Sequence, residues 1–471
     1  MKGIYKKLLF ISLPFLIGEI LNAQGYQAIH GSPYAGSTSI FNNPASSVHS
    51  AYKWDLTLFS TQAKNSTESF FLKNFSLANQ DSAYLTMKDG YSSKFEHAIF
   101  DLSLFNFLYK IDNNHAIGFN LRGRSYNHSK SLPINYVDST VNTFNSFLIA
   151  NRNTAFLEEF TTHTGWLEAD FNYSQVLKET DRSKLSGGVT LQIMKSISGA
   201  FFRVNKLSYL EAKRSTDTSY TFLNGNFAYA YSDNYDNTDN VNDFINTAKT
   251  SFGLSLGIEY LVYKSETNPN DLPNNLNYDW KLGVSLMDIG SNVFRPSIYS
   301  GKFTDPNPVL ADAQWENKLS GSNNIKSFRD SLNTIFTTNS TITENYSIST
   351  PTRLTINIDK NLGNSFFING ELNLNFYSTS SYTKLRTREL NLLTVTTRWE
   401  GMGFGAYLPV QYNTQGQLWV GAALKMGPLV IGLHNLGILK KDPTLNGGGY
   451  LLFSIHPFNK KRIISKLDCL Y

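Results

Sequence analysis

Beyond its first 23 residues, this 471-residue sequence has no apolar run long enough to cross a membrane as a helix. Such a helix needs about 20 consecutive apolar residues, and the mean hydropathy of the chain is only −0.27. The absence argues against a helical membrane protein. It leaves a membrane β-barrel open, because a barrel strand needs only every second residue to be apolar.

Cysteines, paired histidines and basic clusters are also scarce. The single cysteine, Cys469, cannot form a disulfide framework within the chain and has no predicted role. None of the eight histidines has the spacing of a zinc site, so neither a metal nor another cofactor is predicted. The basic residues are scattered apart from residues 460–462, which argues against nucleic acid as a partner.

The N-terminus has the pattern of a secretory signal peptide. Three lysines lie within the first seven residues, a mostly apolar stretch continues to Ile17, and Leu21-Asn22-Ala23 ends on a small residue. This order predicts a signal peptide over residues 1–23 that is cleaved before Gln24. The alternative is an uncleaved anchor helix, for which the apolar stretch is short. The chain is therefore expected to be exported.

Apolar and polar residues alternate along many segments after residue 50. Every second residue is apolar from Ile117 to Leu121, and the same pattern runs from Phe252 to Tyr260. Side chains of a strand point alternately to its two faces, so each segment is predicted to be a strand with one apolar and one polar face. The polar faces supply the candidate lumen-facing residues, which are Asn120, Arg122, Arg124, Glu259, Asp279, Lys281, Asn369, Glu371 and Asn373.

A soluble β-sandwich would produce the same alternation, but three features favour a transmembrane barrel. The apolar pattern often continues for about the 9–11 residues of a spanning strand. Aromatic residues, 14 % of the chain, gather at the predicted strand ends, and full charges occupy the polar face in mid-strand. We therefore expect an all-β, antiparallel transmembrane barrel over residues 51–456, with about 14 strands or, alternatively, 16. Residues 457–471 are expected to form a periplasmic tail.

The predicted links between strands are of two kinds. Short links occupy residues 111–115, 178–184 and 362–363, and long polar links with little to bury occupy about 127–160, 232–249 and 290–350. Outer-membrane barrels keep short turns on the periplasmic side and long loops outside. In such a wall, Leu121→Arg is predicted to impair folding into lipid, whereas Arg122→Leu is predicted to be tolerated.

Residues 24–50 lack alternation and include Asn43, Pro44 and Ala45. With the first predicted strand beginning soon afterwards, this segment resembles the N-terminus of the FadL-like outer-membrane family, which transports hydrophobic compounds. The resemblance implies that Asn43-Pro44-Ala45 belongs to a hatch that folds into the barrel. An ordinary turn is the alternative interpretation, because Asn-Pro favours turns wherever it occurs.

Two later segments, residues 350–354 and 425–432, resemble the Bacteroidetes branch of such barrels, which includes the PorP/SprF-like proteins of type IX secretion and gliding. The resemblance implies the outer membrane of a Gram-negative bacterium of that phylum. The partners that it implies are outer-membrane lipid and lipopolysaccharide, a hydrophobic small molecule, and proteins of the periplasm or the cell surface.

Two catalytic motif matches do not fit their surroundings. Residues 253–257 match G-x-S-x-G, but the serine lies in an alternating segment rather than at the strand-to-helix turn that this nucleophile needs. Residues 401–406 match a relaxed dinucleotide fingerprint, but strand-like residues follow instead of a helix. An acidic stretch over residues 233–243 lacks the glycine and terminal glutamate of an EF-hand. No catalytic residue is predicted, and the chain is not expected to be an enzyme.

Two functions remain for a barrel without catalysis. The first is a passive channel or transporter for hydrophobic or amphipathic small molecules, which the hatch-like segment favours. The alternative is a structural or secretion-linked barrel that anchors partner proteins, which the Bacteroidetes resemblance favours. Solute flux through the reconstituted protein tests the first, and co-purification of partners tests the second.

Overall fold

The computed structural model describes residues 28–74, 84–137, 140–141, 143–213, 218–236, 241–264, 276–378, 382–440 and 445–457. The predicted signal peptide, residues 1–23, lies outside these ranges, and so does the predicted tail beyond Pro457. Within the described ranges, no helix combines the length and the apolar character that crossing a membrane requires.

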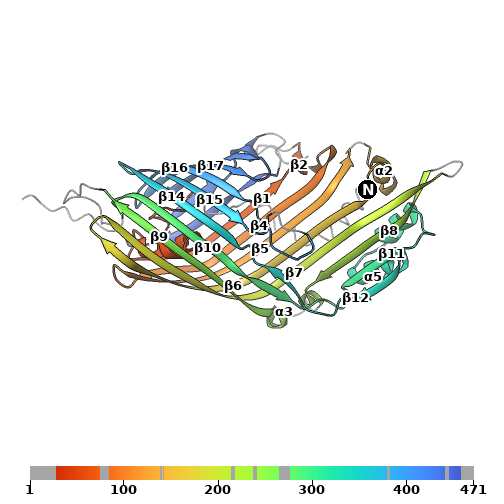
Figure 1. Ribbon diagram of the computed structural model, residues 1–471, viewed down its shortest axis with the longest axis horizontal. Coiled ribbons are helices and arrows are strands. Elements are labelled where there is room, and N and C mark those ends of the chain that lie inside the picture. Colours follow the sequence, from red (N-terminus) through yellow and green to blue (C-terminus); the bar gives the residue numbers. More distant parts are fainter. Residues whose placement is uncertain are drawn as a thin grey trace, which may run out of the picture.

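Antiparallel strands close into a barrel (Figure 1). Fourteen strands form its wall, which confirms the predicted fold class and strand number. In order around the wall they are β1 (Trp54–Thr67), β4 (Gly90–Lys110), β5 (His115–Tyr136), β6 (Leu157–Thr180), β7 (Ser183–Lys213), β9 (Lys249–Tyr263), β10 (Tyr278–Phe294), β14 (Arg353–Gly363), β15 (Phe366–Asn375), β16 (Leu392–Glu400), β17 (Phe404–Asn413), β19 (Ala422–Met426), β20 (Leu429–Leu433) and β21 (Gly447–Ile455). Pairing of Leu56 with Ile455 and of Asn65 with Gly447 joins β1 to β21 and closes the ring.

The wall strands have an apolar outer face and, from β1 to β16, a mainly polar inner face; in β17 to β21 the inner face also carries buried apolar residues. In β5, Leu121 is 41 % exposed on the outside, whereas Asn120 and Arg122 are buried inside. In β9, Ile258 lies outside and Glu259 inside. The exposed apolar residues of the wall include Leu121, Leu191, Leu256, Ile258, Val284, Ile358, Ile368, Val395, Leu408, Leu424 and Ile431. Such a band is the lipid-facing surface of a transmembrane barrel.

Short and long connections lie at opposite ends of the barrel. Turns of two to four residues join β4 to β5, β6 to β7, β14 to β15, β16 to β17 and β19 to β20. Trp54 pairs with Tyr109 beside the first of these turns, so the barrel begins, and through β21 also ends, at the short-turn end. One link at this end, between β9 and β10, is longer than the pattern predicts.

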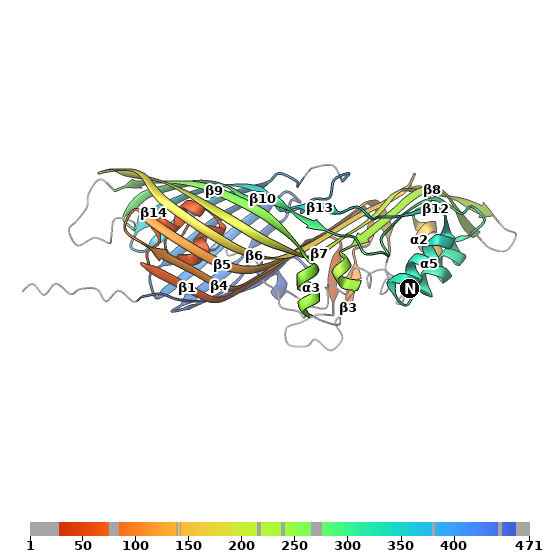
Figure 2. The ribbon, with the colours of Figure 1, turned by 90° about the horizontal axis from the view of Figure 1, so that it is seen from below.

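Beyond the barrel mouth, the wall continues into a second folded unit, here called the extension (Figures 1 and 2). β5, β6 and β7 have 22, 24 and 31 residues, about twice or more the length that spans a bilayer. Their outer halves form a sheet with β8 (Thr218–Tyr231), β11 (Gly301–Pro306) and β12 (Phe336–Thr341). Strand β7 changes partner along its length: residues 183–196 pair with β9, and residues 200–213 pair with β8.

Helices α2 (Phe144–Ala150), α4 (Asp312–Ser320) and α5 (Ile325–Ile335) cover one face of the extension. In α5, Phe328, Leu332 and Ile335 lie on one helical face because three or four residues make one turn. They join a buried core that also contains Leu148, Tyr220, Phe222, Phe227, Tyr229, Phe303, Trp315 and Phe336. The prediction that the long links have little to bury is therefore wrong, since single aromatic residues spread through polar sequence converge here.

Shorter elements complete the described structure. They are η2 (Gly36–Phe41), η3 (Pro44–His49), β2 (Phe70–Lys73), β3 (Tyr84–Met87), η4 (Asp233–Asp236), α3 (Val241–Thr247), β13 (Tyr346–Ser349), β18 (Leu418–Val420) and η5 (Leu436–Leu439). The 3-10 helices η2 and η3 lie inside the barrel, where Figure 2 shows them in red.

Candidate functional site: a closed lumen

Residues 28–53, here called the hatch, fill the lumen between the wall strands. Asn43 begins η3: its backbone is extended, and its side chain accepts a hydrogen bond of 2.9 Å from the N–H of Ala45. Pro44 occupies the first helical position, where its missing N–H costs nothing and its fixed φ suits the helix. Asn43-Pro44-Ala45 is thus a turn that starts a helix, and it lies within a hatch.

Three glycines of neighbouring strands let this turn approach the wall. A Cβ at Gly188 in β7 would lie 2.3 Å from the carbonyl carbon of Pro44, and one at Gly257 in β9 would lie 2.0 Å from Asn43 Oδ1. A Cβ at Gly283 in β10 would lie 3.0 Å from Asn43 Nδ2. That nitrogen donates to the carbonyl of Ile258 over 3.0 Å. Only glycine allows a backbone to come this close.

Polar contacts tie the hatch to strands on every side of the lumen. Ser47 Oγ donates to Asn172 Oδ1 over 2.7 Å in β6, and Ser32 Oγ donates to Glu400 Oε2 over 2.7 Å in β16. Further contacts join His30 to Glu371, Ser37 to Asp55, Asn42 to Glu371, Ser46 to Glu259 and His49 to Ser186. The hatch is therefore a plug held by hydrogen bonds and charge, and also by an apolar cluster in which Ile29, Ile40 and Phe41 pack with wall residues of β17 to β21.

One wall arginine faces the ring of Phe41 at the end of η2. The guanidinium of Arg122 lies 4.2 Å from the centre of that ring. Its Nε donates to Glu168 over 2.7 Å and its Nη1 to Asp101 over 3.3 Å, and all these groups are buried. Charged groups without water need such partners, because an unpaired buried charge is costly.

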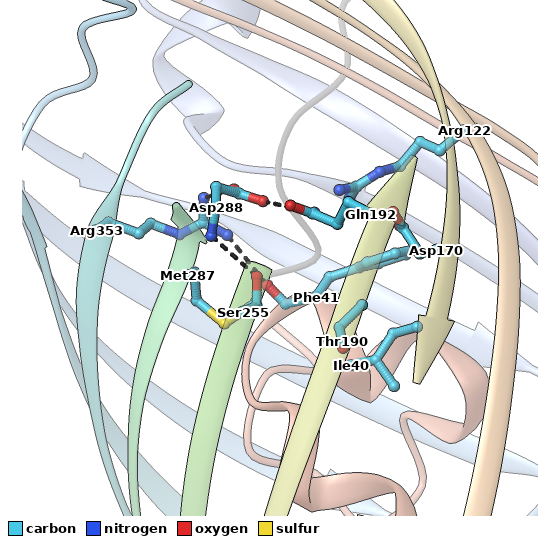
Figure 3. Close-up of a pocket in the computed structure, with 10 residues that line it drawn as sticks. All are labelled: Ile40, Phe41, Arg122, Asp170, Thr190, Gln192, Ser255, Met287, Asp288 and Arg353. Atoms are coloured by element: carbon cyan, nitrogen blue, oxygen red, sulfur yellow. Dashed lines mark hydrogen bonds and ion pairs between the residues drawn. The ribbon is translucent and has the colours of Figure 1, made fainter. Parts of the chain in front are cut away.

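A second ion cluster binds the backbone carbonyl of Phe41. Arg124 binds both carboxylate oxygens of Asp288 at 2.9 Å, and Arg353 Nη1 binds Asp288 at 2.6 Å. Arg353 Nη2 also donates to the carbonyl oxygen of Phe41 over 3.1 Å. Figure 3 shows Arg353 reaching Phe41 at the end of η2, and Gln192 reaching Asp288. Phe41 is thus held by Arg122 on its ring and by Arg353 on its carbonyl.

Two small spaces adjoin this contact. A cavity of about 10 Å³ lies beside Ile40 and Phe41, and one of about 90 Å³ lies on the loop side of Phe41 and Asn42. The larger cavity has room for several water molecules. Charged side chains, among them Lys64 and Arg122, line it together with the apolar Ile99 and Leu390.

The structure places most of the predicted lumen residues inside the barrel. Asn120, Arg122, Arg124, Glu259, Lys281, Asn369 and Glu371 are buried there, and Asn373 bonds to Glu371 and Thr355. Arg122 and Arg124 belong to the two ion clusters, through Glu168 and Asp288. Glu371 and Glu259 accept hydrogen bonds from Asn42 and Ser46 of the hatch.

Asp279 differs from this expectation. A register shift between Tyr278 and Trp280 turns Asp279 away from the lumen, because a bulge places two residues opposite one. Asp279 binds Lys360 at 2.8 Å, and Lys360 lies 4.5 Å over the ring of the outward-facing Trp280. Tyr278 takes the inner position instead and bonds to Asp359.

Several groups that hold the hatch escaped the sequence analysis, namely Phe41, Asp101, Glu168, Asp288 and Arg353. Asp101 and Glu168 sit on polar strand faces, so complete use of the period-two pattern would have found them. Asp288 breaks that pattern: it has a φ of 55° beside another register shift, and both it and Met287 are buried.

The motif matches have structural explanations. Ser255 lies within β9 and accepts the backbone N–H of Asp288 over 2.9 Å, so no exposed nucleophile turn is present at this serine. Residues 404–406 belong to β17 rather than to a helix. Asp233 binds Arg295 and Asp236 binds Tyr231 and Ser297, while Asp239 lies outside the described residues. Among the side chains placed here, no three His, Cys, Asp or Glu residues form a metal-binding group.

A family model described as a family of unknown function (DUF5723) matches residues 44–433. No curated protein matches the sequence. A solved FadL homologue from Pseudomonas aeruginosa is similar over 91 % of this chain and 95 % of its own, with 11 % identity and a TM-score of 0.41.

Two further solved structures are similar. A TodX deletion mutant, described as a monoaromatic hydrocarbon channel, has 9 % identity and a TM-score of 0.40 over 89 % of this chain and 93 % of its own. The translocator domain of the autotransporter NalP from Neisseria meningitidis has 10 % identity and a TM-score of 0.29, over 86 % and 88 %. Such low scores carry no argument about function. The barrel and its hatch agree with the FadL-like resemblance, and the Bacteroidetes branch stays a prediction.

Proposed function

We propose that this chain, which belongs to the family of unknown function DUF5723, is an outer-membrane channel that its own hatch holds closed. The channel admits small amphipathic solutes when the hatch moves, and lipid and lipopolysaccharide surround its apolar outer face. The proposed role involves no catalytic step.

The observation that carries this proposal is the way the hatch is held. Within the described residues, η2 and η3 make no strand pairing with the wall. Ser32, Asn42 and Ser47 bond to wall side chains instead. A net contribution of about 0.5–1.5 kcal/mol is typical for one such bond, and water can replace it. The hatch can therefore move while the strand ladder of the wall stays intact.

The lining beside the hatch favours an amphipathic solute over a purely hydrophobic one. Arg122 and Arg353 border the larger cavity, and so do Ile99 and Leu390. An apolar molecule would leave the charged groups without water, which is unfavourable, whereas a molecule with one polar end satisfies both kinds of lining.

A reversible lock tests the proposal. Ser47 Oγ and Ser174 Oγ lie 2.8 Å apart, so Ser47→Cys with Ser174→Cys, in a Cys469→Ser background, places two sulfurs within reach of a disulfide. We expect the oxidised protein to be closed in liposome-swelling assays and its solute flux to return on reduction. Single Ser47→Cys is the control. Equal flux before and after reduction of the double variant would show that the hatch is not the gate.

A second candidate function follows from the extension. Its buried aromatic core makes it a folded unit outside the membrane rather than a set of loose loops. A barrel that presents such a unit to proteins of the cell surface or, through its short-turn end, of the periplasm would fulfil a structural or secretion-linked role. Cross-linking in native membranes, followed by mass spectrometry of the cross-linked peptides, distinguishes this role by the presence of one recurrent partner on the extension.

A further inference from the structure

The connection between β15 and β16 crosses the mouth of the barrel. Its described residues 382–391, here called the lid segment, lead into β16 and contact strands β5, β6 and β7. Arg203 of β7 donates to the carbonyl oxygen of Tyr382 over 2.8 Å. The Tyr382 ring packs edge-on against Phe160 of β6 at 5.0 Å and stacks on His128 of β5 at 5.8 Å. In the ring of fourteen strands, β5 stands opposite β16, and β6 and β7 follow β5.

Arg388 fastens the lid segment in place. Its guanidinium lies 3.9 Å from the centre of the Tyr382 ring, and its Nη1 donates to the carbonyl oxygen of Tyr377 over 2.8 Å. Only 2 % of this arginine is exposed. The neighbouring Thr387 donates its N–H to the carbonyl of Ser349 over 2.9 Å, which ties the segment to β13. The lid segment therefore has a defined closed position.

A chamber lies between the lid segment and the hatch. It is the cavity of about 90 Å³, and residues of both closures line it: Phe41 and Asn42 on one side, and Glu389 and Leu390 on the other. The wall between them contributes residues of β1, β4, β5, β14 and β15, and Leu392 of β16. The lumen is thus closed twice, with a space in between.

Two opposite charges facing this chamber stand outside the two ion clusters, although they lie near enough to act on each other electrostatically and Glu389 also acts on Arg353. Arg122 is compensated by Asp101 and Glu168, and Arg124 shares Asp288 with Arg353. Lys64 and Glu389 both line the same chamber. Neither makes a side-chain hydrogen bond, or an ion pair within 4 Å, with any residue in the described ranges; Lys64 lies only 5.7 Å over the ring of Trp419.

We propose that the lid segment is an extracellular closure and that the chamber beneath it binds a small zwitterion, such as an amino acid. The carboxylate of the ligand meets Lys64, and its ammonium group meets Glu389. Partly enclosed charges gain most from such pairing, because little water competes. Since Glu389 belongs to the lid segment, the bound ligand holds the lid closed. The inference rests on the proposed function in that the chamber lies on the proposed route.

Binding is tested on the refolded full barrel in detergent by isothermal titration. The probes are L-alanine, which carries both charges, and acetate and ethylammonium, which carry one each. We expect L-alanine to bind and the two half-ligands to bind at least tenfold more weakly. Lys64→Met and Glu389→Gln should each weaken alanine binding at least tenfold, about 1.4 kcal/mol. The same substitutions at two exposed residues outside the chamber, Lys249→Met and Glu211→Gln, are the matched controls.

Acetate binding equal to that of L-alanine, unchanged by Glu389→Gln, would make the chamber an anion site and overturn the zwitterion. Absence of alanine binding in a correctly folded barrel would overturn it as well. Either result leaves the disulfide test of the hatch untouched. Conversely, alanine binding in a barrel that the hatch lock fails to close would retain this site and reject the gated channel.

The lid is tested by access to the chamber from outside. In a Cys469→Ser background, Lys64→Cys is reacted with a charged, membrane-impermeant thiol reagent added to proteoliposomes. We expect slow modification with the native lid and at least tenfold faster modification when Arg388→Ala or, as a second variant, Tyr382→Ala is added. Both variants must retain heat-modifiable gel mobility. Equal rates in all three proteins would show that residues 382–391 do not close the chamber.

Discussion

The guanidinium of Arg122 lies 4.2 Å from the centre of the Phe41 ring, so a cation–π contact joins a wall strand to the hatch. The same guanidinium holds Glu168 and Asp101 by buried hydrogen bonds. Arg122 therefore contributes both to the stability of the wall and to the docking of the hatch. Substitution of Phe41 tests the docking role alone, and substitution of Arg122 tests both.

Phe41→Ala should loosen the hatch without unfolding the barrel. The change removes the ring from Arg122 and leaves the ion pairs in place. We expect more frequent channel openings in planar bilayers at unchanged urea stability. Arg122→Leu should instead destabilise the barrel by about 3–5 kcal/mol, because Glu168 and Asp101 stay buried without their partner. This reverses the expectation from the sequence alone. Adding Glu168→Gln should recover part of the loss, and no recovery would contradict the assignment.

The polarity of the wall gives a prediction about folding. Leu121 lies on the outer face of β5, in the half of the strand that belongs to the barrel, and an added charge in the lipid there costs about 2–4 kcal/mol. Leu121→Arg should therefore reduce the heat-modifiable fraction after refolding into vesicles. Leu210, which is 57 % exposed on β7 in the extension, is the control, and Leu210→Arg should refold normally. Equal yields for the two variants would mean that the two positions do not differ in their contact with lipid.

A side chain added at a wall glycine that contacts the hatch should displace the hatch. A Cβ at Gly257 would lie 2.0 Å from Asn43 Oδ1, whereas the nearest atom to a Cβ at Gly370 in β15 is 4.0 Å away. Gly257→Ala should push the hatch from its place and raise solute flux, while Gly370→Ala should leave flux unchanged. Proteolysis after residue 28 in folded protein would report the released hatch. A protected hatch in Gly257→Ala would contradict the close approach.

Hatch docking should weaken in acid through His49. Burial lowers the pKa of this imidazole well below 6.5, and the charges of Lys281, Lys184 and Lys110 lower it further, although Glu259 lies 3.9 Å away. At neutral pH the ring is neutral whether the hatch is docked or free. As the pH falls through about 6.5, the free hatch takes up a proton first, so docking loses up to about 1.4 kcal/mol per pH unit.

Channel opening should therefore increase between pH 7 and pH 5, and His49→Gln should flatten this part of the pH profile. Opening that increases equally in the variant would assign the effect to other groups.

Disruption of the extension core should leave the barrel folded. Trp315 is 4 % exposed and packs 4.1 Å from the ring of Phe222. Trp315→Ala should cost the extension about 3–5 kcal/mol. We expect rapid trypsin cleavage within residues 290–350 and normal heat-modifiable mobility of the barrel. Loss of barrel folding in this variant would show that the two cores form one cooperative unit.

The sequence predicts the barrel well because its signal has a fixed period. Leu121 and Arg122 differ by one position and lie on opposite faces, and no long-range contact is needed to infer it. The lack of alternation over residues 24–50 shows that this stretch is not a wall strand, and the resemblance carried by Asn43-Pro44-Ala45 implies its place inside the barrel. These parts of the fold are encoded locally.

The parts that escape prediction depend on irregular backbone or on distant partners. Bulges at Asp279 and Asp288 each shift the register by one residue. The first turns Asp279 away from the lumen against the prediction, and the second brings Asp288 into the lumen where the alternation does not predict it. The pairing of Trp315 with Phe222 joins residues almost a hundred positions apart, and neither neighbourhood looks apolar. The alternation along a strand predicts which face a side chain lies on, but it does not predict which distant element packs against that face.

Strand β7 passes without interruption from one sheet into the other, with Gly188 under Pro44 in its first half and the partners of β8 in its second. Because side chains alternate with every residue, one inserted residue between the halves would invert all faces of the second half. The outer unit is therefore no detachable module that could be exchanged between barrels by splicing at a loop. Because β5 and β6 also run on into the extension, an exchange of this unit would have to interrupt three strands within their ladders.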